Sequence, residues 1–143
     1  MPIGQSPGLD TYDKKRVIYA DAVAGEPLSI GHAIAIVSVF GTKRVYRCGA
    51  STHAEMFVGF ADTNAAMGSK LLIVVGRGSR VVPIVEGGGP LTVNTRVFLS
   101  ATPGEVTQTP MPRGPGVFVV AVGDAISPTE IDLLTDYKIK TPS

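Results

Sequence analysis

Cys48 and His53, a thiol and an imidazole five residues apart, are the first residues in this sequence to consider as catalytic. A cysteine nucleophile needs a base and an electropositive setting that favours the thiolate. Arg44 and Arg47 lie close enough in sequence to supply that setting. An unpaired cysteine at a strand end is far more often a small buried apolar residue. We therefore predict that Cys48 belongs to the core and that the chain is not an enzyme.

The two histidines, His32 and His53, are the obvious starting point for a metal site, together with Glu55 and Asp62. Their spacing matches none of the common ligand patterns. A single cysteine also excludes a cysteine-rich zinc site and an intramolecular disulfide framework. The sequence therefore predicts no metal and no other cofactor.

A glycine-rich segment, Gly-Arg-Gly-Ser-Arg at 76–80, follows an apolar run and is similar to a phosphate-binding loop. Such a loop needs a following helix whose N-terminus faces the anion. The residues that follow, 80–85, are β-forming, so the segment instead predicts the turn of a β-hairpin between two neighbouring strands. Arg77 and Arg80 would then lie at the hairpin tip, where we expect them to contact a partner.

The elements that would position these residues are short and β-forming. The sequence has 17 glycines and 11 prolines, which separate β-branched runs at fairly even intervals. The runs cover residues 16–20, 34–40, 44–48, 56–61, 70–76, 80–85, 96–100, 116–123 and 130–134. This pattern predicts an all-β fold, either a small β-barrel or a jelly-roll-like β-sandwich.

Two local signals interrupt the strands. Segment 50–56 predicts one short helical turn, capped by Ser51 or Thr52. Pro83 removes a backbone donor from the run 80–85, so that strand is expected at a sheet edge or at a bulge.

The length of 143 residues fits one domain. Residues 1–13 contain two prolines, two glycines and few apolar residues, so we expect an extended N-terminal arm before a single β domain over 14–143. The N-terminus lacks a signal-peptide pattern, and the longest apolar run, 33–40, is too short to span a membrane. We expect no membrane association.

Charge narrows the class of partner. The chain has 13 basic and 12 acidic residues, for a formal net charge of +1. This balance argues against nucleic-acid binding, which needs a concentrated basic face. It also leaves little repulsion between copies, which suits a protein that works packed against other proteins.

The order of turns and strands in the last two-thirds of the chain resembles the capsid decoration (cement, head-stabilising) proteins of tailed bacteriophages. The matching segments are VGFADTNAAMGSKLLIVVGRGSRVVPIV at 58–85, GPLTVNTRVFLSATPGEVTQTPMP at 89–112 and GVFVVAVGDAISPTEIDLL at 116–134. About half of the chain carries the resemblance. It departs from the usual form at Asn94 and Thr95, which stand where a Gly-Asp or Gly-Gln turn is common.

The resemblance implies a non-enzymatic structural protein of the virion, assembled in the host cytoplasm and bound to the outer capsid surface. Its partner would be the major capsid protein, whose neighbouring subunits it would bridge, and the chain would form a homotrimer or homodimer. The same turns occur in tail-fibre and head-fibre modules, so an adhesin that contacts a host receptor remains the alternative.

Three places are expected to contact the partner. The first is the arm and its end, with Tyr12, Lys14 and Lys15. The second is the turn that carries Arg77 and Arg80. The third is the proline-rich crossing at 110–115, with Pro112 and Arg113, because its restricted backbone loses little entropy on binding.

Overall fold

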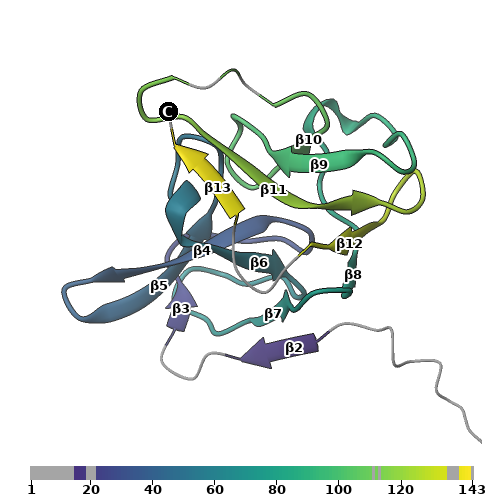
Figure 1. Ribbon diagram of the computed structural model, residues 1–143. Coiled ribbons are helices and arrows are strands. Elements are labelled where there is room, and N and C mark those ends of the chain that lie inside the picture. The colour runs from purple at the N-terminus through teal and green to yellow at the C-terminus, as the bar shows by residue number, and fades with distance from the viewer. Residues whose placement is uncertain (1–14, 19–21, 111, 113, 135–138, 143) are drawn as a thin grey trace, which may run out of the picture.

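The computed structural model describes residues 15–18, 22–110, 112, 114–134 and 139–142 (Figure 1). Over these ranges the protein is all-β, built from two sheets and two short 3-10 turns. The predicted fold class is therefore confirmed. The predicted arm at 1–13, with Tyr12, lies outside the described residues, as do Lys14 and Arg113.

The first sheet has the strand order β2-β7-β6-β4-β5-β3. Its strands are β2 (Lys15–Ile18), β3 (Ala22–Ala24), β4 (Ala33–Val39), β5 (Thr42–Arg47), β6 (Phe57–Ala61) and β7 (Leu72–Val75). Neighbours are antiparallel except β3 and β5, which are parallel. The β4–β5 hairpin projects beyond the other strands of the sheet (Figure 1).

The second sheet has the order β10-β9-β11-β12-β8, and β13 pairs with the first half of β11. Its strands are β8 (Arg80–Val81), β9 (Arg96–Leu99), β10 (Val106–Thr107), β11 (Phe118–Ala125), β12 (Ile131–Leu133) and β13 (Ile139–Pro142). β8 stops two residues before Pro83 and lies at the end of the sheet order. This confirms the edge position that the proline predicted.

The alternation of side chains along β4 divides the interior into two clusters. Ala33 and Ala35 point into the larger cluster, which joins the two sheets and includes Phe60, Val97 and Val120. Ile34, between the two alanines, points into the smaller cluster on the opposite face of the first sheet. The first sheet is thus covered on both faces at its centre.

The hairpin predicted around 76–80 is wrong. β7 pairs with β2 and β6 in the first sheet, whereas β8 pairs with β12 in the second, so the segment crosses between sheets. The Ser79 hydroxyl donates to Val75 O at 2.8 Å, and the Gly78 amide donates to Leu133 O of β12 at 3.0 Å. These bonds close a tight turn that sends the chain to β12 instead of back along β7.

The two 3-10 turns are η2 (Ala54–Met56) and η3 (Glu86–Gly88). η2 confirms the short turn predicted within 50–56. The predicted cap by Ser51 or Thr52 is wrong, because the N-cap residue is His53, with a φ of 55° and no side-chain cap.

Candidate functional site

Cys48 is fully buried, as predicted, and lies in the larger core cluster. Its thiol donates to the backbone carbonyl of His53, with Sγ 3.3 Å from the oxygen. The His53 ring instead stacks on Tyr46, at 5.3 Å between ring centroids. The thiol thus bonds the backbone of His53, and the imidazole ring packs on Tyr46.

His32 serves to hold a loop in place. Its Nδ1 accepts a hydrogen bond from the Ser29 amide at 2.9 Å. Burial lowers the pKa of His32, the Arg47 guanidinium lowers it further, and the Glu26 carboxylate opposes both. Within the described residues no group of three His, Cys, Asp or Glu side chains is arranged to hold a metal ion.

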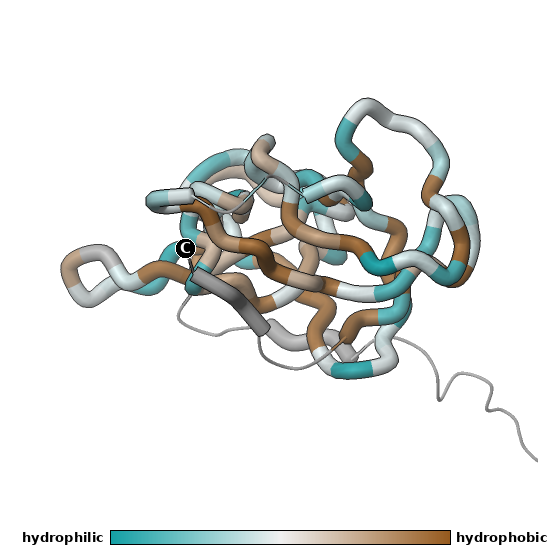
Figure 2. The backbone as a smooth tube through the Cα atoms, turned by 45° about the horizontal axis from the view of Figure 1, so that its top comes forward, coloured by the Kyte–Doolittle hydropathy of each residue, from teal (hydrophilic) through white to brown (hydrophobic). Residues whose placement is uncertain are grey.

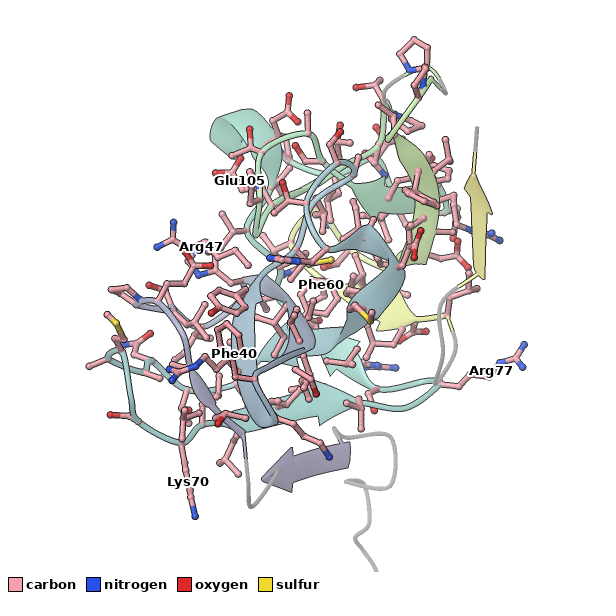
Figure 3. All side chains as sticks on the ribbon, turned by 90° about the vertical axis from the view of Figure 1, so that its left-hand side faces the viewer. Phe40, Arg47, Phe60, Lys70, Arg77 and Glu105 are labelled. Carbon is pink, nitrogen blue, oxygen red and sulfur yellow. The ribbon has the colours of Figure 1, made fainter. Side chains whose placement is uncertain are left out.

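The two arginines of segment 76–80 differ in their surroundings. Arg77 is exposed and points away from the body of the protein (Figure 3). Arg80 pairs with Asp132 of β12, with Nε 3.6 Å from Oδ1, and both side chains are nearly half-exposed. The Asp132 carboxylate thus neutralises part of the charge of Arg80.

The other two described contact candidates are Pro112 and Lys15. Pro112 is exposed in the loop between β10 and β11. Lys15 begins β2, an outer strand of the first sheet, and its backbone pairs with Val75. Lys15, Arg77 and Arg80 therefore lie around the turn that follows β7, whereas Pro112 lies in another loop.

A feature that the sequence did not indicate is an apolar strip, defined here as the exposed residues Ile30, Val82, Pro90 and Pro128, with the buried Pro83 beside them. Val82 lines two hollows, of about 140 and 330 Å³, and so joins them. Ile30 lines the first hollow, and the three prolines line the second. Ile30 and Val82 are each more than half exposed. Contiguous exposed apolar surface is a common feature of interaction sites.

The apolar strip rests on a rigid support. The Gly31 amide donates to Ala61 O at 2.9 Å, and the Ile84 amide donates to Gly31 O at 3.1 Å. Gly31 has a φ of 94°, and a Cβ at this position would come within 2.8 Å of Val82 O. The Ile30 amide donates to the Asn64 side chain at 2.9 Å. The strip is therefore held in shape before any partner arrives.

A second exposed apolar feature is the tip of the β4–β5 hairpin, where the turn residues are Phe40 and Gly41. Phe40 is fully exposed (Figure 3), and the tip has the colour of apolar residues in Figure 2. Both residues have a positive φ, 51° and 82°, as in a type I′ turn. Such a turn favours Asn-Gly, and a bulky residue at the first position is strained.

Comparison with known proteins adds no relative. Neither family models, nor curated proteins, nor solved structures match this chain. In the described part of the chain, no helix is long and apolar enough to cross a membrane.

Only one of the two missed surfaces had a usable signal in the sequence. Gly41 stands alone between two β-forming runs and marks a two-residue hairpin turn, which puts Phe40 at its tip. The apolar strip gave no such signal, because Ile30, Val82 and Pro128 come from segments far apart in the sequence.

Proposed function

We propose that this chain is a non-enzymatic structural protein that binds the outer surface of a tailed-phage capsid and stabilises the mature head by bridging major capsid subunits. The observation that carries the binding role is the apolar strip, an exposed and preformed surface with two adjoining hollows. The capsid as the partner is inferred from the sequence resemblance over residues 58–134.

The proposed role needs only binding and no catalysis. A protein that binds only the mature lattice stabilises that lattice by mass action, and no chemical step is needed. Repeated sites on an icosahedral shell also make weak single contacts effective, because several copies or several contacts act together. A surface held rigid by Gly31 and Ile84 loses little entropy when it docks.

Co-sedimentation with phage heads tests this proposal. Purified protein is mixed with mature, expanded heads and, separately, with unexpanded heads of a phage that encodes it. We expect the protein to pellet with mature heads and to stay in the supernatant with unexpanded ones. Failure to pellet with mature heads overturns the proposal.

A pair of charge variants locates the contact. Val82→Asp places a carboxylate at the centre of the apolar strip, on a side chain that is 56% exposed, so the fold tolerates it. Thr42→Asp adds the same charge to an exposed position on the β4–β5 hairpin, at the opposite end of the molecule (Figure 1). We expect Val82→Asp to abolish pelleting and Thr42→Asp to leave it unchanged.

Removal of residues 1–12 tests the arm separately. If the arm contributes a contact by adding a strand to a neighbouring sheet, the truncated protein binds mature heads more weakly. Unchanged binding excludes the arm and leaves the strip as the contact.

A further inference from the structure

Residues 29–32 form a tight turn whose two ends are joined through His32. The His32 amide donates to Ser29 O at 3.1 Å, and the Ser29 amide donates to Nδ1 of the His32 ring at 2.9 Å. Gly31, the third residue, has a φ of 94°, as a type II turn requires at this position. Ile30 therefore lies at the tip of the turn, where its side chain is 54% exposed and belongs to the apolar strip.

The His32 ring is confined by the neighbouring turn, residues 102–105. A Cβ at Gly104 would come within 2.7 Å of Cδ2 of the ring, so the ring lies directly on the Gly104 backbone. Backbone bonds hold that contact, because the Ala33 amide donates to Gly104 O at 2.9 Å and the Gly104 amide donates to Cys48 O at 2.8 Å. The ring therefore stays in place, and its Nδ1 is the ring atom that can accept a hydrogen bond from Ser29.

Charged groups on two neighbouring segments act on the ring, Arg47 of β5 and Glu26 of the loop before β4. Burial lowers the pKa of His32 and Arg47 lowers it further, whereas Glu26 raises it. Glu105 belongs to the turn that packs on the ring and lies on the same side of the molecule as Arg47 (Figure 3). The ring is thus neutral at neutral pH and takes up a proton below about pH 6.5.

The turn at 29–32 also supports the backbone of the apolar strip. Gly31 O accepts a hydrogen bond from the Ile84 amide at 3.1 Å, two residues from Val82. Ile30 and Val82 line the same hollow of about 140 Å³. If the turn opens, Ile30 leaves this hollow and the Ile84 amide loses its acceptor.

We propose that protonation of His32 opens the turn at 29–32 and takes Ile30 out of the apolar strip, so that the strip is complete at neutral pH and incomplete in acid. Neutral imidazole offers Nδ1 as an acceptor, whereas imidazolium carries a proton on both nitrogens. The Ser29 amide then faces another donor and loses its partner. Since the ring is confined against Gly104, a rotation of the ring supplies no other acceptor.

The same proton adds a positive charge beside Arg47. Within the described residues, Arg47 Nε is buried and has no hydrogen-bond partner, so water screens the guanidinium poorly from a new charge. The imidazolium also attracts the Glu26 carboxylate, which accepts a hydrogen bond from the Arg47 amide at 2.7 Å in the neutral state. Repulsion from Arg47 and attraction to Glu26 both disturb the segment that leads into the turn.

Proton titration of the full chain by NMR tests the switch without any partner. The His32 ring, the Ser29 amide and the methyl groups of Ile30 and Val82 are followed between about pH 7.5 and about pH 5. These signals should change together, with one midpoint below 6.5. Solvent exchange of the Ser29 amide, corrected for the intrinsic effect of pH, should become about fivefold faster on the acid side. Amides of the core strand β11 should stay unchanged, because the rest of the fold remains intact.

Two asparagine variants, one at each of the 2 histidines in the sequence, provide a matched control. His32→Asn keeps an acceptor for the Ser29 amide but does not titrate, so the shared transition should disappear. His53→Asn removes the other imidazole at an exposed position with a φ of 55°, which asparagine tolerates. This variant should keep the wild-type transition.

The effect on binding rests on the function proposed above and is measured separately. Affinity for mature heads should fall about fivefold between about pH 7.5 and about pH 5.5 for the wild type and stay constant for His32→Asn. Absence of binding at both pH values overturns the proposed function, and the NMR titration still decides the switch. Separate midpoints for His32 and Ile30, a transition that persists in His32→Asn, or its loss in His53→Asn would each overturn the switch.

Discussion

The apolar strip and the β4–β5 hairpin both expose large apolar side chains, but the fold holds them in different ways. The strip is anchored by backbone hydrogen bonds between Gly31, Ala61 and Ile84, close to where the two sheets meet. The hairpin is flanked by β3 on the β5 side as far as Lys43, and it ends in a strained turn at Phe40. The strip is therefore held by bonds between segments distant in sequence, whereas the end of the hairpin, residues 39–42, is held by its own turn.

The difference has a functional consequence. A concave surface with fixed hollows suits a partner that brings its own protrusion, such as a subunit of a shell. The strip is therefore the feature that supports a contact with the proposed capsid partner.

The largest expected effect comes from adding a methyl group at a glycine of each region. Gly31→Ala puts a Cβ 2.8 Å from Val82 O at a positive φ, and we expect it to lower the free energy of unfolding by about 3 kcal/mol. Gly41→Ala has the same conformational cost but meets no atom within 4 Å, so about 1 kcal/mol is expected. Urea unfolding of both variants measures the difference, and equal losses would mean that the strip is not rigidly supported.

A smaller effect of the opposite sign is expected at the hairpin turn. Phe40→Asn replaces a strained, fully exposed phenylalanine with the residue that a type I′ turn prefers. We expect the monomer, measured at low concentration, to gain about 1 kcal/mol of stability. A loss of stability would show that Phe40 makes contacts within its own chain.

The contribution of His32 to the free energy of unfolding should make the strip, and not the hairpin, sensitive to pH. Because the pKa of His32 is lowered on folding, the unfolded state binds its proton more readily. The stabilising contribution is therefore present above the unfolded pKa of about 6.5 and is lost as the pH falls below it. Protonation also removes the acceptor for the Ser29 amide, next to Ile30.

We expect the urea midpoint to fall between about pH 7.5 and about pH 5.5, and His32→Gln to reduce that fall. Phe40→Asn, which changes only the hairpin tip, should show the wild-type pH dependence. A His32→Gln variant with an unchanged pH profile would contradict the role of His32 in the strip.

The sequence predicted the local elements because β-branched runs, turn glycines and prolines act over a few residues. It located β4 to β9, β11 and β12 to within a few residues but missed the two-residue β10, and Pro83 correctly indicated the edge position of β8. Pairing was harder to predict. The segment 76–80 reads as a hairpin turn locally, but Gly78 bonds to Leu133, so a partner distant in sequence decides its path.

The candidate contact residues also depend on partners that are distant in sequence. Basic residues and prolines on turns were chosen for their chemistry, yet Arg80 pairs with Asp132 of the neighbouring strand. The apolar strip depends on Ile30, Val82 and Pro128 meeting in space, which no local pattern reports. Recognition surfaces of this kind follow from topology, and only the assembled sheets reveal them.

Hydrogen exchange on head-bound and free protein tests the central claim most directly, because it compares both regions in one measurement. Binding to mature heads should slow exchange of exposed amides in segments 28–31 and 82–89, which form and support the apolar strip. Amides of the hairpin tip, residues 39–42, should exchange at the same rate in the bound and the free protein. Slowed exchange on the hairpin with an unchanged strip would contradict the account.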